Sequence, residues 1–272
     1  MRRFVLLTLL AALLCQGPAK KGTVELPVLM YHHISKDASR SCDYVVTPEL
    51  LEGDLAWLSE RGCTAVSAQE LIDYCAGRGG LPERPVLITF DDGQLSVLEY
   101  ALPLLEKYDM CAVAAVVGSL CDREAGLSWR SPEYSYMDWD EVAQLSASGV
   151  FEIAAHSQAM HEEAYPRRGC LPKPGEGEAD YRRALSEDLE AVERSIEAAS
   201  GARPTAFAWP YGFHCEAGRE LLAERGYRLA LTCEERVNTL TGRPEELMEL
   251  ARFNRPASEP RESFFARLGI AA

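Results

Sequence analysis

The sequence has too few basic residues for a protein that binds nucleic acid through its overall charge. Its 272 residues contain 28 Lys and Arg against 42 Asp and Glu, which gives a formal net charge of −14. Nucleic acids and anionic membrane surfaces both require a basic face on the protein. We therefore expect no nucleic-acid partner, and membrane contact only through the N-terminus.

Several motifs of catalytic and metal sites are also absent. No two cysteines have the CxxC spacing, which argues against a cysteine zinc knuckle. No phosphate-binding glycine loop and no GxSxG elbow occurs, which disfavours a nucleotide-binding protein and a serine hydrolase of that type. Ser157 lies between two histidines, but no third member of a serine triad is evident.

The longest uncharged apolar run lies at the N-terminus. Two arginines precede the run Phe4–Leu14, and small residues follow it, as in a secretory signal. The run is short for a membrane span, and cleavage after Ala19 fits the pattern. We therefore expect residues 1–19 to be a signal peptide and the protein to be exported. A lipid on Cys15 or an uncleaved N-terminal anchor are the alternatives.

Nine cysteines are spread along the chain, and eight remain if residues 1–19 are removed. An even number of cysteines in an exported protein permits disulfides, although the spacing does not determine their pairing. Cys111 lies in an apolar run, so we expect a buried thiol there.

Apolar, β-rich runs alternate with helix-like stretches. The expected strands are Leu26–His32, Val86–Phe90, Cys111–Gly118, Phe151–Ala155, Thr205–Trp209, Arg228–Thr232 and Leu247–Phe253. The expected helices are Pro48–Arg61, Ser67–Ala76, Leu95–Tyr108, Asp138–Ser148, Asp180–Ser200 and Glu216–Arg225. This alternation predicts a mostly parallel sheet, and seven strands favour one α/β barrel-like domain, residues 26–272, over two domains.

Polar residues follow several of the expected strands directly. Asp91 and Asp92 follow the expected strand Val86–Phe90, and His156 and His161 follow Phe151–Ala155. The chain has only five histidines, so two of them this close together after a strand are unusual. Asp-Asp-Gly alone is a common turn signal, with Gly93 permitting the turn. In α/β folds, however, ligand-binding side chains gather at the carboxyl ends of strands. Two imidazoles and one carboxylate there can hold a divalent metal, and the second aspartate can accept a proton from water that the metal acidifies.

These motifs together resemble the polysaccharide deacetylase family, the NodB-homology carbohydrate esterases. The resemblance is carried by TFDDG at 89–93, HSQAMH at 156–161 and FAWPYG at 207–212. The five-residue separation of the histidines, with VLMYHHI at 28–34, is most similar to the poly-β-1,6-N-acetylglucosamine N-deacetylase branch. The resemblance covers roughly residues 26–256 and implies a distorted (β/α) barrel with about seven parallel strands, in agreement with the strand count.

The resemblance also implies roles for individual residues. Asp91 matches the general base of the family. Asp92, His156 and His161 match its metal ligands. Tyr211 matches the residue whose backbone N–H helps to hold the tetrahedral oxyanion.

The sequence departs from the family pattern in two places that concern the mechanism. Ala208 stands where many members have an arginine that steadies the catalytic aspartate, and Arg252 could replace that arginine. The late Leu-x-His that supplies a general acid is absent. His214 could protonate the leaving amine instead, or it could be an exposed loop residue. His32 and His33 alternate along a strand, so only one of them can face the site.

Two aromatic residues, Trp129 and Tyr134, lie in a polar segment. They could stack on sugar rings or cover an edge of the core.

The function that these residues predict is a metal-dependent N-deacetylase. Its partner would be an N-acetylated oligosaccharide or exported polysaccharide: poly-N-acetylglucosamine, peptidoglycan or a chitin-like polymer. The metal would be zinc, with cobalt, nickel, iron or manganese as alternatives. The alternative function is a carbohydrate-binding protein of the same fold that has lost turnover, because the family's general acid is missing.

Overall fold

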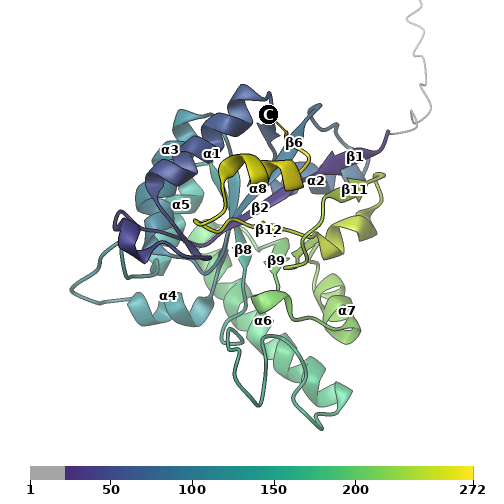
Figure 1. Ribbon diagram of the computed structural model, residues 1–272. Coiled ribbons are helices and arrows are strands. Elements are labelled where there is room, and N and C mark those ends of the chain that lie inside the picture. Colours follow the sequence, from purple (N-terminus) through teal and green to yellow (C-terminus); the bar gives the residue numbers. More distant parts are fainter. Residues whose placement is uncertain (1–21, 272) are drawn as a thin grey trace, which may run out of the picture.

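The computed structural model describes residues 22–271 (Figure 1). The expected signal peptide and Cys15 lie outside the described residues. In the described part, no helix has the length and hydropathy needed to cross a membrane.

A curled, half-barrel sheet forms the centre of the molecule (Figure 1). Within the described residues its order is β10-β9-β8-β7-β6-β2-β12, and β5 also pairs with β6. All of its strand pairs are parallel. The strands are β2 (Val28–Tyr31), β5 (Thr64–Ala65), β6 (Pro85–Phe90), β7 (Ala112–Val116), β8 (Phe151–Ala155), β9 (Ala206–Ala208), β10 (Leu229–Leu231) and β12 (Phe253–Asn254). The predicted barrel of about seven parallel strands is confirmed.

Helices pack around this sheet, as Figure 1 shows. They are α1 (Pro48–Glu60), α2 (Ala68–Cys75), α3 (Leu102–Lys107), α4 (Gly118–Glu124), α5 (Trp139–Ala147), α6 (Glu178–Ser200), α7 (Glu216–Glu224) and α8 (Arg261–Arg267). A π-helical turn, η2 (Val97–Ala101), precedes α3 inside the predicted helix Leu95–Tyr108. Thr47, Ser67 and Asp138 cap their helices with side-chain hydrogen bonds. Helices α4 and α8 were not predicted.

Alternating strand residues divide the core into two layers. Leu87 and Val113 belong to a smaller cluster inside the curl of the sheet, whereas Ile88 and Ala114 belong to the larger cluster beneath the helices. The pair β1 (Val24–Leu26) and β11 (Asn238–Leu240) adds apolar side chains to the smaller cluster. Strands buried on both faces explain why their sequences are continuously apolar.

The predicted strand Leu247–Phe253 is largely wrong. A 3₁₀ turn, η4 (Pro244–Glu249), occupies its beginning, and β12 covers only its last residue and Asn254. Leu247 and Leu250 are buried from irregular backbone. A short apolar run does not distinguish a strand from a buried turn, because both place apolar side chains in the core.

This irregular segment nevertheless closes the sheet. Leu250 bridges to Leu231 of β10, and three residues later Phe253 pairs with Leu29 of β2. The chain thus crosses from one edge strand to the other, and Arg252 lies at the crossing.

Most cysteines of the described residues carry free thiols. Cysteines with free thiols in the described part are Cys42, Cys63, Cys111, Cys121, Cys170, Cys215 and Cys233. Cys111 is partly buried, and this burial raises the pKa of its thiol to about 11.

Candidate functional site

A cavity of about 560 Å³, called here the main cavity, opens at the carboxyl ends of the strands. Six residues that follow these strands line it: His32, Asp91, Asp92, His156, His161 and Tyr211. They come from β2, β6, β8 and β9, of which β2 and β6 are neighbours, as are β8 and β9. The curl of the sheet brings together residues up to 179 positions apart along the chain.

Three of these residues form a cluster of metal-ligating atoms. The Oδ1 atom of Asp92 lies 3.2 Å from Nε2 of His161 and 3.6 Å from Nε2 of His156. Two ligands of one zinc ion are at most about 4.2 Å apart, twice the usual zinc–nitrogen distance. All three donor atoms lie within 4.8 Å of one another, so a small side-chain movement would close them around an ion. The donor set of two imidazoles and one carboxylate fits a divalent metal with open positions.

The hydrogen bond of His156 to the backbone fixes which ring nitrogen faces this cluster. Nδ1 of His156 lies 2.7 Å from the carbonyl oxygen of Ala208, so Nδ1 carries the proton and donates it. Nε2 then presents its lone pair to the neighbouring Asp92. Burial also lowers the pKa of His156, which keeps the ring neutral.

A turn stabilised from a neighbouring helix carries His161. Asp188 of α6 accepts hydrogen bonds from the backbone N–H groups of Gln158 and Ala159, at 2.8 and 2.7 Å. The hydroxyl of Ser157 accepts a hydrogen bond from Met160 N–H at 3.1 Å. Ser157 therefore supports the turn through its side chain. Asp188 was missed because it stands in a long acidic helix where nothing in the sequence distinguishes it.

Asp91, 2% exposed, makes a different set of contacts from its neighbour Asp92. Arg252 donates two hydrogen bonds to its carboxylate, Nη1 to Oδ1 at 2.7 Å and Nη2 to Oδ2 at 2.8 Å. Burial by itself raises the pKa of Asp91, but the charge and hydrogen bonds of Arg252 outweigh burial and hold the pKa well below its usual range. Arg252 thus makes the contact expected of a substitute for the arginine missing at position 208.

Strained backbone is concentrated at this site. Among the described residues, the non-glycine positions with positive φ are Asp92, Asp109, Ser157 and Tyr211. Three of these four belong to the turns at the main cavity. Such conformations are costly for residues other than glycine, and they tend to mark functional sites. Gly93 has φ of 75°, and a Cβ there would lie only 3.2 Å from Val116, which confirms the role predicted for this glycine.

Tyr211 lies in the 3₁₀ turn η3 (Pro210–Gly212) that follows β9. Backbone N–H groups in the first turn of a helix have no acceptor within the helix, so that of Tyr211 is available to a ligand. Its hydroxyl lies 3.4 Å from Nδ1 of His161.

The structure does not bring His214 into the main cavity. Nδ1 of His214 lies 2.9 Å from the carbonyl oxygen of Gly212, and Nε2 lies 3.8 Å from the carboxylate of Glu249. His32, in contrast, lines the main cavity together with the clustered histidines, and its Nδ1 has no hydrogen-bond partner within residues 22–271. His33 points away and contacts Ser96 at 3.1 Å.

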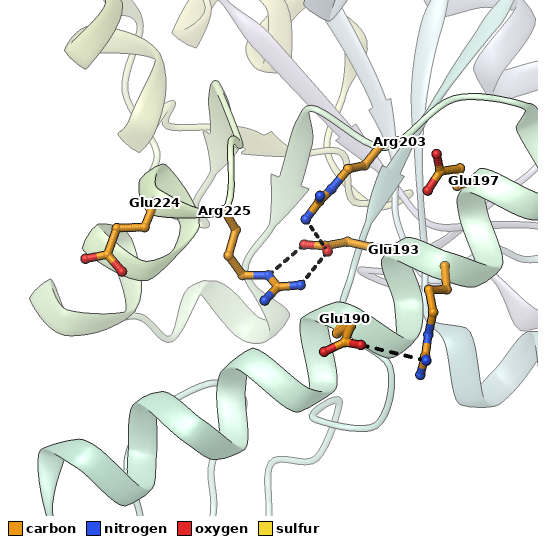
Figure 2. Close-up of a pocket in the computed structure, with 7 residues that line it drawn as sticks. Glu190, Glu193, Glu197, Arg203, Glu224 and Arg225 are labelled. Atoms are coloured by element: carbon orange, nitrogen blue, oxygen red, sulfur yellow. Dashed lines mark hydrogen bonds and ion pairs between the residues drawn. The ribbon is translucent and has the colours of Figure 1, made fainter.

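A second cavity, shown in Figure 2, does not compete with this site as a catalytic centre. It lies between α6 and α7, and buried Glu193 is at its centre. Arg225 donates to both carboxylate oxygens of Glu193, at 2.9 and 2.6 Å, and Arg203 donates to one of them. These charges satisfy one another, so we assign the cluster a role in joining the two helices.

Comparison with known proteins agrees with this arrangement. The family model described as polysaccharide deacetylase matches residues 78–230. The poly-β-1,6-N-acetyl-D-glucosamine N-deacetylase of Escherichia coli K12 is 28% identical over 225 residues, which are 76% of this chain and 33% of that protein. The chain thus spans about a third of the length of this relative.

Solved structures show the same fold. IcaB from Ammonifex degensii is 27% identical with a TM-score of 0.73, covering 90% of this chain and 96% of that one. The de-N-acetylase from Aggregatibacter actinomycetemcomitans has a TM-score of 0.77 at 24% identity, covering 90% and 100%. Because the family model covers more than half of the chain and includes Asp91, Asp92, both clustered histidines and Tyr211, the chain belongs to the polysaccharide deacetylase family.

Proposed function

We propose that this protein is a metal-dependent N-deacetylase whose substrate is a polymer of β-1,6-linked N-acetylglucosamine. The observation that carries the proposal is the pairing of two sites in one cavity: the cluster of Asp92, His156 and His161, and the Asp91–Arg252 ion pair beside it. The names of the E. coli and Staphylococcus aureus relatives support the choice of polymer.

The residues of the cluster would hold one divalent cation. When bound, the cation supplies a Lewis acid that polarises the acetamide carbonyl and lowers the pKa of water. Zinc fits the donor set, and cobalt, nickel, iron and manganese accept the same ligands.

Asp91 serves as the general base in this proposal. Its carboxylate oxygen Oδ2 lies 4.0 Å from Nε2 of His156, so it borders the cluster without belonging to it. Arg252 holds both carboxylate oxygens in place and keeps the group ionised, ready to accept a proton from the attacking water.

The backbone N–H of Tyr211 provides a donor for the oxyanion that forms on the acetamide oxygen. A fixed donor of this kind costs no reorganisation when charge develops, which is why such groups contribute strongly to acyl-transfer catalysis. The positive φ of Tyr211, 58°, shows a backbone held in an unusual conformation at this point.

We propose His32 instead of His214 as the proton donor to the leaving amine, because His32 lines the main cavity and His214 does not. His32→Gln should lower kcat by about 10²-fold, whereas His214→Ala should leave it within a few-fold of wild type. Steady-state acetate release measures both. A loss confined to His214→Ala would return the role to His214.

The function is tested by acetate release from β-1,6-linked N-acetylglucosamine oligomers, with peptidoglycan and chitin fragments beside them. Release should stop after treatment with a chelator and return when one divalent metal is added back. Binding of oligomers with no acetate release from any of them would favour the alternative function, a carbohydrate-binding protein without turnover.

We also propose that residues 1–19 direct export and that residues 26–272 form one catalytic domain. The mature N-terminus should then begin near Lys20 in secreted material. Recovery of protein from the cytoplasm with Met1 intact would contradict export, and a lipid on Cys15 would make the protein membrane-anchored.

A further inference from the structure

We propose that a smaller cavity beside the main cavity is a subsite for the neighbouring sugar unit of the polymer, and that Tyr134 and Trp129 form its outer wall. This inference rests on the proposed function, because it assumes that the substrate is a chain of amino sugars. The inference adds the direction in which the sugar polymer crosses the protein surface. It also names the side chains that bind the polymer there.

The smaller cavity, called here the side cavity, has a volume of about 270 Å³ and adjoins the main cavity. His32, Tyr44 and Asp92 line both. A ligand that places its acetamide at the cluster of Asp92 and the two histidines therefore has its next unit at the entrance of the side cavity. Its volume is about half that of the main cavity, which suits one sugar ring better than a long segment of polymer.

Exposed aromatic rings lie at the outer end of the side cavity. Tyr134 is 63% exposed and lines the cavity, and Trp129 is 68% exposed with its ring centroid 6.4 Å from that of Tyr134. The guanidinium of Arg40 lies 4.4 Å from the centre of the Tyr134 ring, which helps to hold that ring in place. Large aromatic side chains left exposed in this way, beside a cavity with polar groups, are typical of a ligand-binding surface.

A buried polar group lies at the inner end of the side cavity. His33 is 94% buried, and its Nε2 has no hydrogen-bond partner among residues 22–271. Its other nitrogen is engaged with Ser96. The buried ring of His33 is therefore a fixed part of the inner wall of the side cavity.

The wall between these two ends is fixed before any ligand arrives. The Glu133 carboxylate accepts hydrogen bonds from the hydroxyl of Tyr100 at 3.1 Å and from the backbone N–H of Lys36 at 3.2 Å. It also accepts one from the hydroxyl of Ser35, and Arg40 donates to the Glu133 carbonyl. These contacts tie residues 35–40 to Glu133. Binding would therefore cost little ordering of the protein.

An exposed tyrosine of another loop provides a matched control. Tyr165 is 81% exposed and lines a separate groove beside α6, away from the side cavity. If the polymer runs through the side cavity, Tyr165→Ala should behave like wild type and Tyr134→Ala should not. Because both variants replace an exposed tyrosine with alanine, a difference between them reports only on the direction in which the polymer leaves the main cavity.

The experiment compares wild type, Tyr134→Ala, Trp129→Ala and Tyr165→Ala on β-1,6-linked N-acetylglucosamine oligomers of increasing length. In wild type, kcat/KM should rise from the monomer to the short oligomers. Tyr134→Ala and Trp129→Ala should raise KM for oligomers by about three- to tenfold and leave the monomer unchanged. Equal length dependence in all four proteins would overturn the subsite.

A binding measurement separates this inference from the proposed function. Trp129 is exposed, whereas the other tryptophans in the described part are buried or half-buried, so its fluorescence should change when oligomers bind to chelator-treated protein. A saturable change in wild type and in Tyr165→Ala, lost in Tyr134→Ala, supports the subsite even if no acetate is released. Acetate release without this change would leave the function standing and refute the subsite.

Discussion

Asp91 and Asp92 are adjacent in the chain, yet their surroundings give them different chemistry. Asp91 is buried against Arg252, whereas Asp92 points its Oδ1 atom at two imidazole nitrogens. The positive φ of Asp92, 72°, turns the backbone so that the two carboxylates can face different partners. The two neighbouring carboxylates therefore have different partners: Asp91 pairs with the Arg252 guanidinium, and Asp92 lies in the metal-ligating cluster.

The two aspartates should respond differently to conversion to asparagine. Asp91→Asn removes the base but no ligand, so it should retain metal while activity falls by about 10²- to 10⁴-fold. Asp92→Asn should weaken metal binding, and added metal should partly restore its activity. Metal content and acetate release of the purified variants measure both effects. If both variants have wild-type rates and wild-type metal content, the Asp-Asp-Gly segment is only a turn and has no catalytic role.

The ion pair of Asp91 adds a stability effect that must be separated from catalysis. Arg252 is fully buried, so Asp91→Asn leaves it without a counter-charge. Removing one partner of a buried ion pair costs about 3–5 kcal/mol of unfolding free energy, because the other charge stays buried.

We predict that Arg252→Ala destabilises the protein by about that amount, measured by denaturant unfolding. Arg252→Lys keeps the charge but loses the paired hydrogen bonds, and should lower kcat by about 10- to 100-fold with a smaller stability loss. The double variant Asp91→Asn/Arg252→Gln buries no charge at this position and should recover stability without activity. If it is as unstable as Arg252→Ala, the ion pair is not the cause.

At the scale of single elements, the turns after the strands were predicted better than the elements around them. The motif residues follow β6, β8 and β9 as expected, because an apolar run that stops at charged or turn residues has few other interpretations. The segment that positions Arg252 was misread as a strand, since its apolar residues reach the core from a 3₁₀ turn. The distance of His214 along the chain from Tyr211 did not reveal that its ring contacts Gly212 and Glu249 and does not line the main cavity.

The turn after β8 depends on a residue outside it. Asp188 holds the N–H groups of Gln158 and Ala159 and so sets the position of His161. Asp188→Ala should weaken metal affinity by about 10- to 100-fold, the usual effect of losing a group that orients a ligand. With saturating metal, kcat should return to near the wild-type value. Glu187→Ala, at the neighbouring and exposed position, is the control. Equal affinity in both variants would show that α6 does not position the histidine.

At the scale of the whole molecule, the order of the strands in the sheet brings together motifs that are far apart in the sequence. β6 and β8 are separated by β7, so the side chains at their ends approach one another only because the sheet curls. The alternation of strands and helices predicted a parallel sheet, but neither the strand order nor the crossing at Leu250 and Phe253 follows from periodicity. The partners of Asp91 and His156 in other elements therefore became visible only in the folded chain.

Metal binding should be visible in the stability of the whole protein, independently of activity. A ligand that binds only the folded state stabilises it by about 2.7 kcal/mol at a hundred times its Kd. For a chain of this size, that corresponds to a rise in Tm of about 5–10 °C. We therefore expect zinc to raise the Tm of chelator-treated wild type by this amount.

The rise should be lost in His161→Ala, because the cluster then keeps only two ligands. His214→Ala, the same substitution outside the main cavity, should keep the full rise. An equal rise in His161→Ala would mean that the stabilising metal binds elsewhere.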